Sequence, residues 1–314
     1  MAGEKSKKSG EIGEALTEAL LSRIGWKNKM HNLDITCTTP SHINDEGNRR
    51  KSHGDDKLFL YNNPFHDDRT DFVHVSVKNN IDAYPSEAVL RTKLKAYFKA
   101  LNETIECAEY DQKLHEVGTT FQARKVLYYS GLLVWLHNDV DDIEKNIIKS
   151  ISASRLEVET NVPFYVIDNA RASFLLKVTD DLLRRSIGGE YEFYYPRIGT
   201  TIKVDEKRTG NFLPLELISA DIIPAIVRKG DAQELVIYAN EAFQIETYKN
   251  LIAYGLNFAA GLVTKIHVGT SNFSPANDAE SASQARMAFN DRTEEITPFS
   301  YNRTILDLIT EKSS

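Results

Sequence analysis

Two apolar segments joined by a polar connection limit the folds open to this chain. KLFLY (57–61) and FVHVSVK (72–78) are rich in β-branched and aromatic residues, and the second alternates apolar and polar side chains with the period of a strand. The residues between them, NNPFHDDRTD, are mostly turn-forming types. The pattern therefore predicts a β-hairpin.

Helical periodicity flanks this hairpin on both sides. Residues 9–26 place apolar side chains at helical spacing and reach Gly25, where a helix would stop. A second helix is predicted from Ser86, its N-cap, to about Ala108. The polar stretch before the hairpin predicts only a weak strand, at 33–36, followed by a loop.

The rest of the chain continues this mixture of elements and predicts an α/β layered fold. With 314 residues, two domains are expected, an N-terminal one over 1–180 and a C-terminal α/β domain over 181–314 that is a candidate for partner or subunit contacts. Trp26 and Trp135 are predicted core residues. Further strands are predicted at 125–129, 132–136, 162–168, 190–196, 213–218, 234–239 and 265–269, helices near 139–152 and 242–263, and a long loop at 271–285.

Composition excludes several classes of protein. The net charge of −7 counts against a surface that coats nucleic acid indiscriminately, although a local basic groove stays open. No apolar run approaches the ~18 residues of a membrane span and no signal peptide is visible, so a cytoplasmic protein without membrane contact is expected. Cys37 and Cys107 are seventy residues apart without a CxxC pair, which predicts inert buried thiols rather than a disulfide framework or a zinc knuckle.

Acidic residues and a lysine gather at one end of the predicted hairpin. HGDD (53–56) leads into the first strand, while Ser76 and Lys78 share a face near the end of the second. Asp56 can therefore approach Ser76 and Lys78 across the hairpin. Carboxylates that hold Mg²⁺ and a cation that orients water are what phosphodiester hydrolysis needs.

GEIGEALTEALLSRIGW, HGDD and VSVK, in this order, resemble the PD-(D/E)xK nuclease superfamily, which includes the restriction-endonuclease-like Mrr group. The resemblance implies an αβββαβ core and a Mg²⁺ (or Mn²⁺) site. It also implies the following site residues: Glu14 and Asp56 as metal ligands, Ser76 beside the metal, and Lys78 as the catalytic lysine.

A narrower resemblance rests on HGDDKLFLYNNPFHDDR, DFVHVSVK and VPFYVIDNARASFL. These segments are similar to the nuclease subunit of two-component bacterial anti-phage defence systems. The resemblance implies an endonuclease that cleaves DNA and works as the effector subunit of a defence complex. It further implies a second protein subunit encoded nearby and a homo- or hetero-oligomer. The nuclease would stay inactive until infection.

One departure from the superfamily pattern keeps alternatives open. Ser76 stands where most members have a glutamate, and a hydroxyl binds Mg²⁺ weakly, so Asp55 or Asp71 is a candidate for the missing charge. His53 is a further candidate for phosphate contact, although a structural histidine is the commoner case. The alternative function is a catalytically weakened nuclease fold that serves as a DNA-binding or scaffold subunit.

Each site residue also has a plainer explanation. Glu14 lies nearly opposite Ile12 and Leu16 on a helical wheel, where a solvated glutamate would sit. Asp56 could cap the strand entry, and Lys78 could be a solubilising edge lysine. An unrelated α/β protein with chance matches is the third possibility, and it predicts that the first helix and the hairpin do not meet in space.

Overall fold

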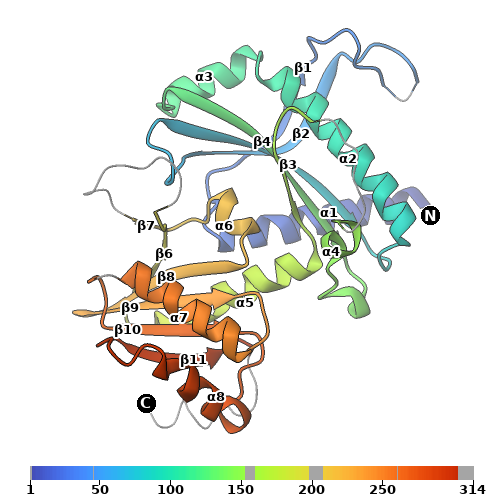
Figure 1. Cartoon of the computed structure of the whole chain (residues 1–314). Coiled ribbons are helices and arrows are strands. Elements are labelled where there is room, and N and C mark those ends of the chain that lie inside the picture. The colour runs from blue at the N-terminus through green and yellow to red at the C-terminus, as the bar shows by residue number, and fades with distance from the viewer. Residues whose placement is uncertain (1, 45, 153–159, 198–207, 260, 303–314) are drawn as a thin grey trace. The chain divides into compact units, whose positions relative to one another are not determined.

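A computed structural model describes residues 2–44, 46–152, 160–197, 208–259 and 261–302. The chain divides into two compact units, of which the first runs to Ser173 and the second begins at Phe174 (Figure 1). This division falls inside helix α5 (Asn169–Arg185), the helix that also contains the predicted boundary at residue 180. Each unit has a mixed sheet accompanied by helices, so the predicted α/β class is confirmed.

The first unit contains a five-stranded sheet in the order β1-β2-β3-β4-β5. The predicted hairpin is β2 and β3, paired antiparallel from Lys57↔Val75 to Asn62↔Thr70. Strand β1 is antiparallel to β2, whereas β3, β4 and β5 are parallel. The elements are α1 (Ala2–Arg23), β1 (Met30–Thr36), β2 (Ser52–Asn62), β3 (Arg69–Asn80), α2 (Glu87–Ala108), α3 (Gln112–Thr120), β4 (Val126–His137), η1 (Val140–Asp142), α4 (Ile147–Ser152) and β5 (Phe164–Ile167). The αβββαβ order is confirmed.

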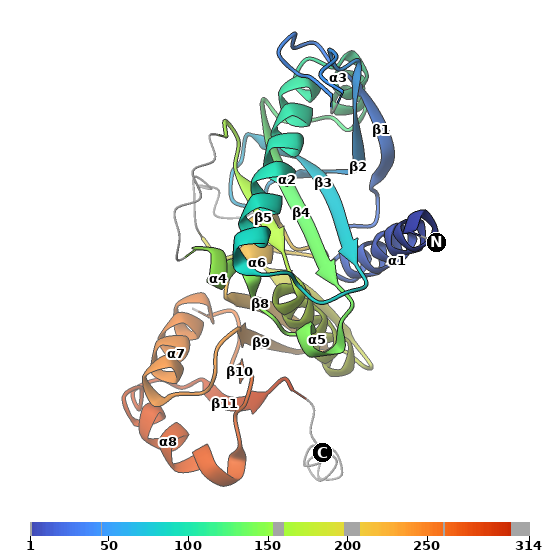
Figure 2. The same cartoon turned by 90° about the vertical axis from the view of Figure 1, so that its right-hand side faces the viewer.

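Helices α1 and α2 pack against opposite faces of this sheet (Figure 2). Gly13 of α1 lies so close to the side chain of Asn79 that a Cβ would not fit, and the Ser9 hydroxyl donates to the Asn79 carbonyl at 3.0 Å. On α2, Tyr97 packs edge-on against Trp135, the partner of Lys78 in the β3–β4 ladder. Side chains alternate along a strand, so Lys78 and Asn79 point to different faces. The first helix and the hairpin do meet in space.

Aromatic packing joins the end of α1 to the hairpin. Gly25 has φ 93°, which ends the helix and turns the chain so that Trp26 stacks on Phe59, with ring centroids 4.4 Å apart. Trp26 and Trp135 are both fully buried, as predicted. Burial of the Trp26 ring removes ~150–250 Å² from water, which holds the end of α1 against β2.

The second unit is built on a six-stranded sheet in the order β11-β10-β9-β8-β6-β7, in which β9, β10 and β11 are parallel and the other pairs antiparallel. Helices α7 and α8 contribute Tyr248, Ile252 and Ala285 to its core, beside Ile237 and Ile266. The elements after α5 are β6 (Glu190–Tyr194), β7 (Thr209–Gly210), α6 (Leu215–Ser219), β8 (Ile222–Lys229), β9 (Ala232–Ala239), α7 (Ile245–Ala259), β10 (Lys265–Thr270), α8 (Pro275–Met287) and β11 (Glu295–Ser300).

The structure differs from the predicted elements at three places. The strands at 125–129 and 132–136 are one strand, β4, because Ser130 and Gly131 continue the extended backbone. The segment 213–218 contains helix α6 after Pro214 instead of a strand. The predicted loop at 271–285 is largely helix α8, whose small polar residues give no apolar stripe although Pro275 and its alanines favour a helix. Within the described residues, no helix is long and apolar enough to cross a membrane.

Candidate active site

Asp56 and Val77 join the two strands of the hairpin where the regular ladder stops. The last paired residues are Lys57 and Val75, and beyond them the Asp56 carboxylate accepts a hydrogen bond from the Val77 backbone N–H at 2.7 Å. Val77 lies between Ser76 and Lys78 in the chain. The bond therefore brings Asp56 to the Ser-Val-Lys segment, and Asp56, Ser76 and Lys78 are all half-buried there.

Lys78 lies on the α2 face of the sheet. Its ammonium nitrogen is 5.6 Å from the centroid of the Tyr97 ring, and it has no ion pair within the part of the chain that the structure describes. Such a cation–π contact is worth ~0.5–1 kcal/mol and leaves the charge available to an anion. Ser76, two residues earlier, faces the same side of β3.

Glu14 approaches the end of β3 from the other face. It is exposed on α1, one residue after the Gly13–Asn79 contact. Among the described residues, no hydrogen bond or ion pair links Glu14 to Asp56 or Lys78. The structure thus places Glu14 near the same strand end as Lys78 without joining the two.

Glu18, one helical turn after Glu14, forms ion pairs that link α1 to the hairpin and to the segment before it, and the sequence did not single them out. Its carboxylate pairs with the Lys29 ammonium at 2.9 Å and the Lys57 ammonium at 3.5 Å. Burial raises the pKa of Glu18, but Lys29 and Lys57 together lower it below its usual value. Since Lys57 follows Asp56, these pairs fix α1 beside the candidate metal ligand. The sequence did contain a signal for Glu18, because residues four apart on a helix share a face and Glu18 is four residues after Glu14.

The two other acidic candidates are engaged elsewhere. Asp55 is buried, and one of its oxygens lies 2.7 Å from Nδ1 of His74. Burial raises the pKa of Asp55, against the opposing effect of His74. Asp71 lies at the far end of the hairpin, where Asn63 and Arg69 donate to it at 2.5 Å and 2.7 Å. Neither carboxylate is placed to replace the glutamate missing at Ser76.

His53, the remaining candidate, is buried away from solvent. Burial lowers its pKa to about 4, so the ring is neutral at physiological pH and a poor partner for phosphate. Its Nε2 lies 3.2 Å from Nδ1 of His42.

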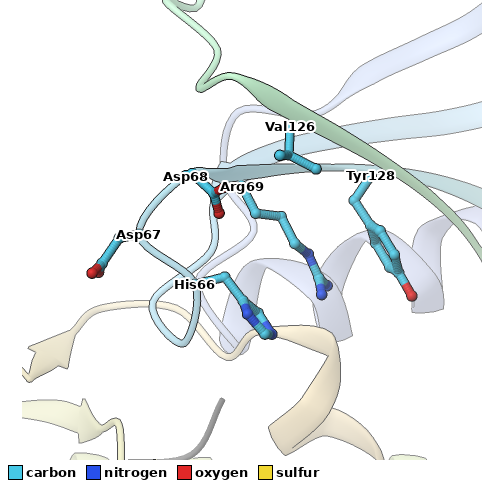
Figure 3. A pocket seen from close by; sticks show the side chains of 6 residues that line it. All are labelled: His66, Asp67, Asp68, Arg69, Val126 and Tyr128. Carbon is cyan, nitrogen blue, oxygen red and sulfur yellow. The ribbon is translucent and has the colours of Figure 1, made fainter. Parts of the chain in front are cut away.

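An open hollow exists at the opposite end of the sheet from Lys78. It lies where β3 and β4 begin, and Arg69 extends beside the ring of Tyr128, with its guanidinium carbon 3.7 Å from the ring centroid (Figure 3). The hollow therefore does not coincide with the Asp56–Lys78 segment. Its lining residues are His66, Asp67, Asp68, Arg69, Val126 and Tyr128.

The family model of the GAPS4 protein PD-(D/E)XK nuclease domain matches residues 1–171. The chain belongs to the GAPS4 PD-(D/E)XK nuclease family. The matched part of this GAPS4 chain contains α1, the β2–β3 hairpin and all four residues of the predicted site, which gives it a nuclease domain. No curated protein and no solved structure matches the chain.

Proposed function

We propose that this GAPS4 chain is a Mg²⁺-dependent endonuclease that hydrolyses DNA phosphodiesters at the Asp56–Lys78 end of the hairpin. The observation that carries the proposal is the hydrogen bond from Val77 N–H to Asp56. It holds a carboxylate and the Ser-Val-Lys segment together across two strands, in the order typical of this nuclease family.

The donor atoms at this site suit a hard divalent cation. Asp56 uses Oδ2 for the Val77 bond, and in the described part of the chain neither its Oδ1 nor the carboxylate of Glu14 has a partner. Mg²⁺ prefers oxygen ligands and is usually held by one or two carboxylates with several waters. Asp56 would hold the ion, or Mn²⁺ in its place, and Glu14 would become a second ligand by reaching past the end of β3 from the other face of the sheet. The bound cation would polarise the phosphoryl oxygen and lower the pKa of a bound water.

The chain's own residues divide the remaining tasks. The Lys78 ammonium, steadied by Tyr97 and without an internal carboxylate partner among the described residues, is placed to orient the attacking water and to offset charge that develops on the phosphate. Ser76 faces the same side and offers a neutral oxygen where most superfamily members have an acid. Loss of that acid would weaken metal binding while leaving Asp56 and Lys78 in place.

Phosphate recognition can come from α2 despite the net charge of −7. Lys93 and Lys95 flank the buried Leu94 on this helix, and neither forms an ion pair with a described residue. Because residues two apart on a helix do not share a face, one of these lysines at most would contact the backbone of a duplex that reaches Lys78. Such contacts position DNA without reading its sequence.

A defence role and a partner subunit form the second part of the proposal. The family is one of bacterial anti-phage nucleases, and an unrestrained nuclease damages its host. We therefore propose a cytoplasmic effector that assembles with a second protein encoded nearby and stays silent until infection. Purification of this chain from its native host with no second protein would contradict the partner.

The test is the conversion of supercoiled plasmid to nicked and linear forms. Wild-type protein, Lys78→Ala and the control Lys99→Ala are each incubated with and without Mg²⁺, alone and with the neighbouring gene's product. The proposal expects metal-dependent nicking that Lys78→Ala lowers ~100-fold or more and Lys99→Ala leaves intact. DNA binding without cleavage in every condition would instead establish the weakened, DNA-binding subunit.

A further inference from the structure

Two cysteines and two histidines form a buried cluster in the first unit. Cys37 follows β1, His42 lies in the next loop, His53 is on β2 and Cys107 is on α2. One ligand atom from each residue lies within 4.8 Å of the other three, and every side chain is at least nine-tenths buried. The nuclease site uses none of the four.

Four of the six distances within this Cys/His cluster match the edges of a tetrahedron around one ion, and the two from His53 to the sulfurs are within 4.8 Å. The two sulfurs are 3.9 Å apart, Nδ1 of His42 is 3.6 Å and 3.5 Å from the sulfurs of Cys37 and Cys107, and the His42 and His53 nitrogens are 3.2 Å apart. Bond lengths to Zn²⁺ of ~2.3 Å for sulfur and ~2.05 Å for nitrogen predict edges of about 3.8, 3.6 and 3.3 Å. The four distances agree with these edges to within about 0.1 Å.

Hydrogen bonds from neighbouring residues orient the ligand atoms of His42 and Cys107 toward the centre of the cluster. Nε2 of His42 lies 3.1 Å from the carboxylate of Glu106, which also accepts a hydrogen bond from Asn102 at 2.6 Å. With its Nε2–H given to Glu106, the His42 ring presents the lone pair of Nδ1 to the cluster. A carboxylate behind a ligand histidine is the usual support in zinc sites. The Thr38 hydroxyl donates to the Cys107 sulfur at 3.8 Å, a contact that favours a thiolate.

We propose that Cys37, His42, His53 and Cys107 bind a structural Zn²⁺ ion. A tetrahedral set of two thiolates and two imidazoles is typical of zinc, whereas Mg²⁺ prefers oxygen. Four protein ligands leave no open position for water or substrate, so this ion supports the fold and takes no part in hydrolysis. Binding replaces the two thiol protons, which pass to solvent.

The zinc site would tie the segment after β1 to the end of α2. It joins the loop that carries Arg49, Arg50 and Lys51 to the helix through Cys107, and it holds His53 three residues before Asp56 on the same strand. The start of β2 would then be anchored on one side by metal and on the other by the bond of Asp56 to Val77. The ion thereby positions a residue of the proposed nuclease site.

The experiment measures metal content, which does not depend on nuclease activity. Full-length wild-type protein and the variants Cys107→Ser, Asp56→Asn and His115→Gln are purified without chelator and analysed by inductively coupled plasma mass spectrometry. The proposal expects one zinc per chain in wild type, in Asp56→Asn and in His115→Gln, an exposed histidine outside the cluster. It expects near-complete loss in Cys107→Ser. Retention in Asp56→Asn separates this ion from the proposed catalytic metal.

A second measurement covers the case in which Cys107→Ser does not fold. Wild-type protein produced with Co²⁺ in place of zinc should show the intense visible bands of tetrahedral cobalt and a thiolate-to-metal charge-transfer band. Zinc-free, cobalt-silent wild-type protein with two titratable thiols, or with a Cys37–Cys107 disulfide, would overturn the proposal while leaving the nuclease proposal untouched.

Discussion

Glu18 on α1 and Lys57 on β2 form an ion pair of 3.5 Å directly beside Asp56. The same carboxylate neutralises Lys29, whose side chain has no exposed surface. These ion pairs therefore hold helix α1 next to Asp56, the candidate metal ligand.

Glu18→Gln should destabilise the first unit by about 1–3 kcal/mol, because it leaves the buried ammonium of Lys29 without its counter-charge. Urea denaturation followed by tryptophan fluorescence measures this effect, since Trp26 is buried just after the end of α1. The double variant Glu18→Gln with Lys29→Met should recover part of the loss. Equal stability of Glu18→Gln and wild type would show that the pair contributes nothing.

Glu14→Gln should raise the Mg²⁺ concentration needed for half-maximal nicking by about tenfold, if its carboxylate is the second metal ligand of the nuclease. Glu11→Gln is the matched control, an exposed glutamate one turn earlier on the same helix. The measurement is the plasmid assay over a Mg²⁺ titration. Identical curves for the two variants would remove Glu14 from the site and leave it a solvated helix residue.

Ser76→Glu should restore the acid that most relatives in the superfamily carry and should lower the half-maximal Mg²⁺ concentration several-fold, because a carboxylate binds the ion more tightly than a hydroxyl. Ser76→Gln has the same size without the charge and should not show this gain. A decrease in activity with both variants would mean that the side chain of Ser76 is limited by space.

His137 should make the stability of the protein depend on pH. Burial lowers its pKa in the folded state, although its Nδ1 lies 2.7 Å from the carbonyl of Asp82. The unfolded chain binds a proton near the usual histidine pKa of ~6.5, so stability present above pH ~6.5 is lost as the pH falls toward the lower folded-state pKa.

His137→Asn removes this titration and keeps a donor near the position of Nδ1. The drop in urea midpoint between pH 7 and pH 5 should therefore be smaller in this variant than in wild type. His115→Asn, at an exposed histidine, is the control and should keep the wild-type drop. An unchanged drop in His137→Asn would show that other groups set the acid sensitivity.

The hairpin and its flanking helices could be predicted because their signals are local. Period-two alternation in 72–78 and the stripe on 86–108 each report which side of one element is buried. The α8 segment gave no such signal, since small residues such as Ala282 and Ala285 pack without forming a long apolar stripe. Strand β8 was not predicted. Most of its residues are buried, so its sequence is a nearly continuous apolar run without the alternation that marks a strand with one exposed face.

The proximity of candidate site residues could be predicted only for residues on strands that are neighbours both in the chain and in the sheet. Asp56 and Lys78 lie on adjacent strands of one hairpin, so their order in the sequence indicates their approach. The Cys/His cluster gave no recognisable spacing, because Cys107 comes from a helix fifty-four residues after His53 and meets it only through tertiary packing. Likewise, only the structure shows that Asp55 is committed to His74 and Asp56 is not.

The parallel ladder between β3 and β4 has a consequence for how the protein reaches its native state. Twelve residues of β3 pair with twelve of β4, from Arg69↔Val126 to Asn80↔His137, across a fifty-seven-residue separation. Non-local parallel pairing closes slowly because its loop-closure entropy is lost before contacts form. During synthesis the β2–β3 hairpin can form before β4 has been made, so the edge of β3 that contains Lys78 is still unpaired. In that interval the unpaired edge of β3 would be open to pairing with another newly made chain.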